Sequence, residues 1–170
     1  MISPTELVAF INSSYSQADR NLAAAGAAPS RVIVPKRYAI LFTGIAINTT
    51  QTGQINISAN GDFFLTRMLY AANIANAAQT NNTLVIPQLR VQITDSGSDE
   101  QFANQAVDIA SIASLSTLSD TGGGTDEPYP RVITGRSTLT VAITNTEAVN
   151  TYNVEFILVG ALVKTWAGNL

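Results

Sequence analysis

The stretch that decides the fold is Pro128–Trp166, PYPRVITGRSTLTVAITNTEAVNTYNVEFILVGALVKTW, in which apolar and polar residues alternate over two long segments. Within Ser137–Asn145, aliphatic residues alternate with threonines, and a similar alternation resumes from Tyr152. A period of two is typical of a β-strand with one face in a core and the other in water. After Ile157 both faces are apolar, so we expect the end of the last strand to be covered on both sides. These two antiparallel strands predict a β-sandwich or barrel that closes on itself.

The pattern upstream of this stretch predicts further strands from Tyr38 onward. In chain order they are Tyr38–Ile47, Gln54–Ser58, Asp62–Ala72, Thr83–Thr94, a short strand within Val107–Ile112, and Arg131–Thr134. Between the last two lies Ser119–Pro130, an acidic, Gly-rich segment that we expect to form a loop. Together with the two closing strands the count is about eight, which favours an all-β fold, an antiparallel β-sandwich of the jelly-roll type.

The N-terminal segment has a different pattern and predicts a helix. Ser3-Pro4-Thr5-Glu6 places a cap residue, a proline and a glutamate in the order that opens a helix. We expect this helix to end near Ala25, with a narrow apolar stripe on one face. The stripe consists of Leu7, Phe10, Ile11 and Tyr15.

A linker follows the predicted helix over Gly26–Pro35, because Pro29 and Pro35 disfavour helix and the residues between them are extended in character. We therefore divide the chain into an arm, residues 1–37, and a jelly-roll β-domain, residues 38–170. An isolated helix of this length is only marginally stable in water. We expect its stripe to dock on a neighbouring subunit or on a larger shell; the alternative is that it packs across the end of its own sandwich.

The composition excludes several classes of chemistry. The chain has no histidine and no cysteine, which removes the usual general base, the commonest metal ligand and the thiolate nucleophile. We accordingly expect no enzymatic activity, no cofactor and no required metal. The first ten residues lack a basic start, and no apolar run is long enough for a membrane span, so we expect neither a secretory signal nor a membrane partner.

Charged residues make up only 12% of the chain, and the formal net charge is -3. The only lysines are Lys36 and Lys164, so the sequence offers no basic stripe for phosphates, and nucleic-acid binding is not expected. A surface with so few charges is suited to contact with other protein. We therefore expect a homo-oligomer, and favour a trimer over a dimer.

Three groups of acidic residues are candidate sites. Asp120-Thr121-Gly122 matches the triplet of aspartic proteases, but only one copy exists and further glycines follow it, so we expect a loop. Asp95–Glu100 gathers three carboxylates, the oxygen ligands that Ca²⁺ prefers, without EF-hand spacing; a solvated loop is favoured over a calcium site. Asp62 and Glu155 are the least loop-like acids and the candidates for glycosidase chemistry, although exposed strand residues are the simpler interpretation.

Adjacent phenylalanines in one predicted strand give a further expectation. Phe63 and Phe64 must point to opposite faces of the strand, so one of them lies in the core and the other lies outside it or in an interface. We therefore take this pair as a candidate interface in the β-domain.

Two segments of the chain, ANGDFFLTRMLY (Ala59–Tyr70) and the later run from Pro128 to Val163, resemble small jelly-roll virion proteins of tailed bacteriophages. The residues that carry the resemblance are Asp62-Phe63, Pro128 and Pro130, Leu139–Asn145 and Val154–Val163. Residues 1–37 lie outside it.

The resemblance implies a head decoration or cement protein, made in the host cytoplasm and located on the head surface of the virion. Its partners would then be the major capsid protein and further copies of itself. The alternative is a tail or fibre component that binds host carbohydrate, because jelly rolls also serve as lectins. An adhesion or assembly module of a bacterium is a third possibility. The sequence leaves the lattice position, the shell protein, the host and the subunit number open.

Overall fold

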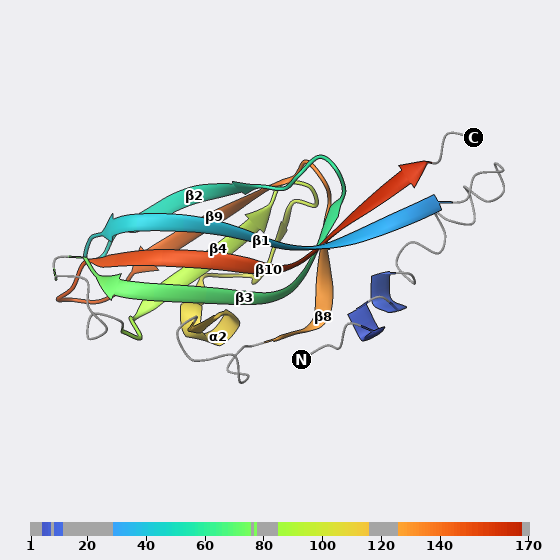
Figure 1. Ribbon diagram of the computed structural model, residues 1–170. Coiled ribbons are helices and arrows are strands. Elements are labelled where there is room, and N and C mark those ends of the chain that lie inside the picture. The colour runs from blue at the N-terminus through green and yellow to red at the C-terminus, as the bar shows by residue number, and fades with distance from the viewer. Residues whose placement is uncertain are drawn as a thin grey trace.

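The strands that alternate in sequence form two sheets in the computed structural model, and these sheets pack face to face as a sandwich (Figure 1). The structure describes residues 5–7, 9–11, 29–75, 77, 85–115 and 126–167. Residues 5–7 and 9–11 are helical, in agreement with the predicted N-terminal helix. The elements that follow are β1 (Pro29–Ile45), β2 (Thr50–Asn56), β3 (Asp62–Ile74), β4 (Leu89–Asp95), β5 (Glu100–Gln101), β6 (Val107–Asp108), α2 (Ile109–Ile112), β7 (Ser114–Leu115), β8 (Asp126–Ile133), β9 (Thr138–Asn145) and β10 (Tyr152–Ala167).

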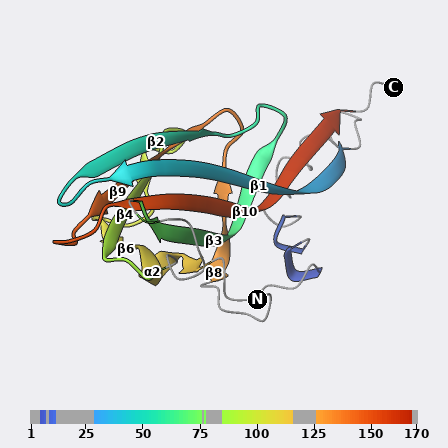
Figure 2. The ribbon, with the colours of Figure 1, turned by 60° about the vertical axis from the view of Figure 1, so that its left-hand side comes forward.

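The order of strands confirms the predicted jelly-roll type of sandwich. Sheet A has the order β1-β10-β3, with both β7 and β8 paired to β3. Sheet B has the order β2-β9-β4, with both β5 and β6 paired to β4. Successive long strands alternate between the two sheets, and every described pair is antiparallel apart from β3 with β7. Figure 2 shows the two layers from a second side, with β10 between β1 and β3.

The first and last strands are longer than the sandwich that they build. Val32 of β1 lies opposite Lys164 of β10, and the pairing continues to Pro29 and Ala167. These ends project from the sandwich as a two-stranded ribbon (Figure 1). Near its other end β1 has a bulge at Gly44, whose φ of 65° is in the region that favours glycine, and the Gly44 N–H donates to Asn153 Oδ1 at 2.8 Å.

Several boundaries differ from the sequence-based expectations. The first strand starts at Pro29 rather than Tyr38, because the segment interpreted as the end of the linker pairs with β10. Both of its prolines are compatible with an edge strand, where a missing N–H costs no ladder hydrogen bond. The division of the chain at residue 37 stays a prediction.

Two other segments also differ from their predicted form. Val107–Ile112 is not one strand, since two residues pair with β4 and the next four form the helical turn α2. Asp126 to Pro130, predicted as loop, belongs to β8.

The main core lies between the two sheets. It is built from the inward faces of all the long strands, with Phe63, Tyr70, Tyr152 and Phe156 among its largest fully buried side chains. Burial of this kind supplies most of the folding free energy, at about 25 cal/mol per Å² of apolar surface removed from water. Among the described residues, no helix has the length and apolar character needed to cross a membrane.

Candidate interaction surfaces

The outer face of sheet A, which points away from sheet B, carries an apolar surface in its middle. The pairing of β1 with β10 and of β10 with β3 aligns side chains into rows that run across three neighbouring strands. We call them the arginine row, the apolar row and the glutamate row. They consist of Arg37, Val159 and Arg67; of Ala39, Ile157 and Leu69; and of Leu41, Glu155 and Ala71.

The exposure of these rows distinguishes them from the core. Leu41 is 64% exposed, and Ala39 is exposed beside it, whereas Ile157 and Leu69 are partly exposed. The residues that alternate with them on the same strands, such as Phe42 and Phe156, are buried between the sheets. A partly exposed apolar row beside the exposed Leu41 marks a candidate interaction surface.

The charges on this face are separated along the strands. Arg37 and Arg67 flank Val159, and Glu155 lies four residues away from Val159 on β10, roughly 13 Å at the rise of a strand. Among the described residues, an ion pair joins Arg131 to Glu100, at 3.7 Å, away from these rows. On β1, β10 and β3 the outer face therefore presents positive charge on one side of the apolar row and negative charge on the other. Beyond β3 the arginine row continues to Asp126 of β8, which lies opposite Arg67.

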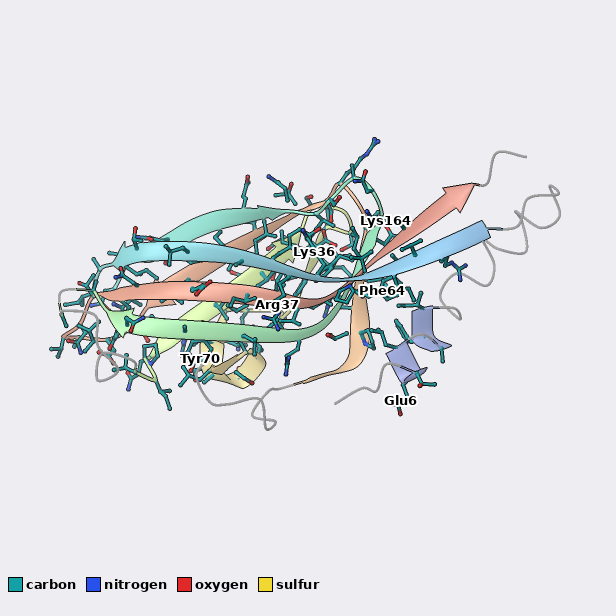
Figure 3. All side chains as sticks on the ribbon, in the orientation of Figure 1. Glu6, Lys36, Arg37, Phe64, Tyr70 and Lys164 are labelled. Carbon is teal, nitrogen blue, oxygen red and sulfur yellow. The ribbon has the colours of Figure 1, made fainter. Side chains whose placement is uncertain are left out.

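A second apolar cluster covers the same face closer to the ribbon. Ile11 is fully buried there against Phe64 and Val163, and Leu7, Phe10 and Ile33 pack around them. The rings of Phe10 and Phe64 meet edge to face, with centroids 6.1 Å apart. Figure 3 shows Phe64 at the end of the sandwich near the short N-terminal helix that carries Glu6. We call these six residues the arm cluster.

Three of the four predicted arm residues lie in the arm cluster. In this structure Leu7, Phe10 and Ile11 contact their own β-domain, which is the alternative that the sequence left open. Docking of the arm on a neighbouring subunit stays a prediction, and the fourth stripe residue, Tyr15, lies outside the described residues. The cluster also explains why β10 is apolar on both faces after Ile157, since Ala161 and Val163 are buried on the outer side.

The two adjacent phenylalanines point to opposite faces, as their positions in the strand predict. Phe63 lies in the main core and packs edge to face against Tyr38, with ring centroids 5.0 Å apart. Phe64 lies in the arm cluster on the outer face. Whether either residue contacts another subunit stays a prediction.

The acidic candidates occupy separate parts of the molecule. Asp62 lies opposite Val163 on β10, eight residues from Glu155, which is roughly 26 Å at the rise of a strand. Paired glycosidase carboxyls lie about 5 to 9.5 Å apart. Asp62 Oδ1 instead accepts a hydrogen bond from the Gly135 N–H at 2.9 Å, a structural contact between β3 and the β8–β9 turn.

The Asp95–Glu100 segment forms a turn that uses its own carboxylate. Asp95 is buried, its Oδ1 accepts from the Gly97 N–H at 2.9 Å, and its Oδ2 accepts from the Ser98 hydroxyl at 3.1 Å. Glu100 faces Arg131. The part of the chain that the structure describes contains no group of three His, Cys, Asp or Glu residues placed to hold a metal. The Asp120-Thr121-Gly122 triplet lies outside the described residues.

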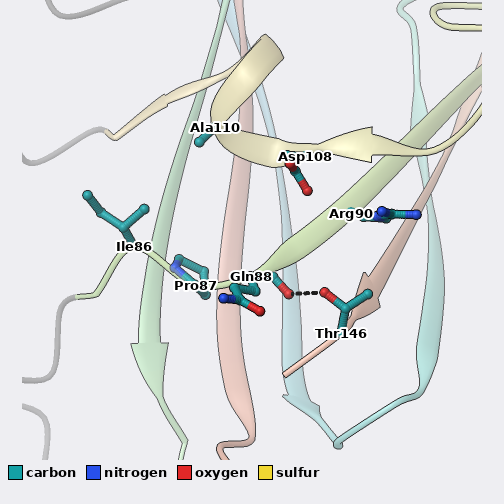
Figure 4. A pocket seen from close by; sticks show the side chains of 7 residues that line it. All are labelled: Ile86, Pro87, Gln88, Arg90, Asp108, Ala110 and Thr146. Atoms are coloured by element: carbon teal, nitrogen blue, oxygen red, sulfur yellow. Dashed lines mark hydrogen bonds between the residues drawn. The ribbon is translucent and has the colours of Figure 1, made fainter. Parts of the chain in front are cut away.

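An open pocket of about 390 Å³ lies beside β4 and β6 (Figure 4). Arg90 and Asp108 face each other across the two strands, and the Thr146 hydroxyl donates to the Gln88 carbonyl oxygen at 2.8 Å. The remaining lining residues are Ile86, Pro87 and Ala110. The lining mixes polar and apolar residues and holds no aromatic ring on which a sugar could stack.

The sequence did not single out the rows of the outer face. One available signal was the loss of alternation from Ile157, which indicates apolar residues on both sides of β10. The partners of these residues on β1 and β3 could not be recognised, because the register of three distant segments decides which residues share a row.

Comparison with known proteins gives no family. No family model matches the sequence, and no curated protein matches it. The fold is similar to a chain in the capsid asymmetric unit of cyanophage Pam1, with 16% identity over 79% of this chain and 86% of that chain and a TM-score of 0.40.

A chain in the acid-stable capsid of Helicobacter pylori bacteriophage KHP30 shares 13% identity over 81% of this chain and 99% of that chain, with a TM-score of 0.35. Dimeric latent PorU from Porphyromonas gingivalis also matches, at 13% identity and a TM-score of 0.32, over 79% of this chain but 13% of its own. Identities and TM-scores are low throughout, so these similarities assign neither a family nor a function.

Proposed function

We propose that this chain is a non-enzymatic structural protein of a phage virion, which binds the head shell from outside as a decoration or cement protein. The observation that carries the proposal is the outer face of sheet A, where a partly exposed apolar row lies beside the exposed Leu41 on a charge-poor sandwich. Such a surface loses little conformational entropy and little charge hydration when it contacts other protein. Its proposed partners are the major capsid protein and further copies of itself.

The segments that resemble phage virion proteins support this proposal through their place in the fold. Leu139–Asn145 lies in β9, the central strand of the β2-β9-β4 sheet, and Val154–Val163 lies in β10, between β1 and β3. Asp62-Phe63 opens β3 beside β10. The resemblance therefore involves the strands around which both sheets are organised.

A second candidate function is carbohydrate binding by a tail or fibre component. The observation that favours it is the pocket lined by Arg90, Asp108 and Gln88, because their charged and amide groups can hydrogen-bond sugar hydroxyls. A glycan array separates the two proposals, since the lectin function requires saturable binding to a defined sugar. An Arg90→Ala variant that loses such binding would establish the pocket as its site.

To test shell binding, the purified chain is mixed with head shells of the particle that encodes it, after this protein has been removed from those shells. The expected result is cosedimentation that saturates, and electron cryomicroscopy that shows added density on the outer shell surface. Density on the tail alone, or no binding at a high concentration of the purified chain, would contradict the proposal.

We also propose that the arm residues Leu7, Phe10, Ile11 and Tyr15 contact the shell or a neighbouring subunit in the assembled particle. The main core contains none of the arm cluster, so the sandwich should fold without the arm. Deletion of residues 1–28, which stops before β1, should leave the melting temperature nearly unchanged and abolish cosedimentation. A deletion variant that instead melts far lower as a monomer would show that the arm serves its own β-domain.

A further inference from the structure

We propose that the outer face of sheet A binds the same face of a second copy of this chain. The two-fold axis runs along the apolar row, so that Ala39, Ile157 and Leu69 of one copy face the same residues of the other. This inference concerns the purified chain in solution, where no shell occupies the face; on a particle the shell and the second copy would compete for it.

The order of the three rows makes the face complementary to itself. The apolar row lies in the middle, the arginine row on one side and the glutamate row on the other. Rotation about a two-fold axis along the middle row reverses the direction of the strands, so it exchanges the two sides. It keeps each strand at the same position across the sheet, so β1, β10 and β3 of one copy face β1, β10 and β3 of the other. The arginine row of each copy then faces the glutamate row of the other.

The positions across the sheet determine which side chains meet. Glu155 belongs to β10, the middle strand, whereas Arg37 belongs to β1 and Arg67 to β3. In the pair of copies, each Glu155 carboxylate therefore lies between the two guanidinium groups of the other copy. An isologous interface of this kind repeats every contact twice, so four arginines and two glutamates are brought together.

The charges also select this axis over the other two-fold in the plane of the sheet. An axis along the strands would place the arginine row of one copy against the arginine row of the other. Like charges in a desolvated interface cost several kcal/mol. The selected axis instead brings unlike charges together, with each Glu155 between Arg37 and Arg67 of the other copy.

The size of the surface determines how strongly the two copies should associate. Strands about 4.8 Å apart and rows about 6.8 Å apart make the three rows a patch of a few hundred Å². A standard interface buries about 800 Å² on each partner, so the dimer should be weak and concentration-dependent. The geometry favours a two-fold pair, whereas the composition alone had favoured a trimer.

The test uses charge reversal on the full chain, followed by analytical ultracentrifugation up to about 1 mM, a range suited to weak association. Glu155→Arg and the double variant Arg37→Glu with Arg67→Glu should each weaken dimerisation at least tenfold, because each opposes like charges at both ends of the pair. An equimolar mixture of the two variants should restore the dimer, since every contact in the mixed pair joins unlike charges. Val149→Arg, in the exposed β9–β10 connection, is the matched control and should leave dimerisation unchanged.

Three results would overturn the inference: a wild-type chain that stays monomeric at 1 mM, a mixture that fails to form dimers while the wild type does, or trimers that the reversals leave unchanged. Melting curves of the variants establish that they are folded.

A second measurement uses the absence of cysteine from the chain. Position 157 lies at the two-fold axis, so Ile157→Cys should be crosslinked into a dimer by a short bis-maleimide that spans about 10 Å, the spacing of packed sheets. A yield no greater than that of Val149→Cys would also overturn the proposal.

Discussion

Replacing Asn145 with alanine should destabilise the sandwich more than any neighbouring surface change, because this amide closes three hydrogen bonds at the end of β9. Asn145 is fully buried. Its Nδ2 donates to the carbonyl oxygens of Ile45 at 3.1 Å and Asn150 at 2.8 Å, and its Oδ1 accepts from the Glu147 N–H at 3.0 Å. These bonds connect the end of β1 in one sheet, the end of β9 in the other, and the connection to β10.

The expected magnitude follows from those three bonds. Each contributes about 1 kcal/mol net, and the alanine variant leaves two carbonyls and one N–H without this partner, so the loss is about 3 kcal/mol. For a chain of this size each kcal/mol corresponds to about 2–4 °C, which predicts a fall in melting temperature of roughly 6–12 °C. Thr144→Ala is the control, because its hydroxyl lies 2.7 Å from the Thr50 hydroxyl at an exposed position and should contribute below about 1 kcal/mol.

Urea unfolding of both variants, followed by circular dichroism, measures the difference. The dependence on urea should be unchanged, since neither variant alters the surface exposed on unfolding. If Asn145→Ala costs no more than Thr144→Ala, the hydrogen bonds of this amide do not hold the two sheets together at this end, and the argument is refuted.

Three further outcomes are expected. Gly160→Ala should cost about 2 kcal/mol or more in urea unfolding, because its Cβ would fall on the Phe64 backbone carbonyl of β3. Gly53→Ala meets only side-chain atoms of Ile40 and Phe42, which can move, so it should cost less; equal losses would contradict this. Burial, followed by the interaction with Glu147, raises the pKa of Tyr152 to about 12. The stability that its neutral form contributes is therefore full below pH 10 and is lost as the pH rises toward 12. The free energy of unfolding of Tyr152→Phe should fall less steeply over that range, and an equal slope would refute the assignment. Melting curves in Ca²⁺ and in EDTA should superimpose, because both Asp95 carboxylate oxygens are engaged within their own turn; a Ca²⁺-dependent rise absent in Asp95→Ala would contradict this.

The strands near the C-terminus could be predicted because the pattern that identifies them lies within a few consecutive residues. Side chains on successive strand residues point to opposite faces, so Leu139, Val141 and Ile143 alternate with threonines wherever such a strand has one buried face. The same stereochemistry separates Phe63 from Phe64. The cap and apolar stripe of the N-terminal helix are likewise local patterns, and helical residues occur there.

Features that depend on distant segments could not be predicted. The first strand reaches back to Pro29 only because β10 supplies its partner from the other end of the chain. Short segments such as Val107–Ile112 lack enough periods to distinguish a strand from a helical turn, and the packing against β4 decides there.

The sequence by itself determined that this chain is a β-sandwich with an apolar-striped helix at its start and few charges on its surface. Only the tertiary structure decided which residues meet on the outer face of sheet A. Arg37, Glu155 and Arg67 come from three strands far apart in the chain, and a shift in register at the bulge between β3 and β10 changes the partner of every later residue. A one-residue slip would exchange the core face and the outer face, so the rows exist only because core packing fixes the register of all three strands at once.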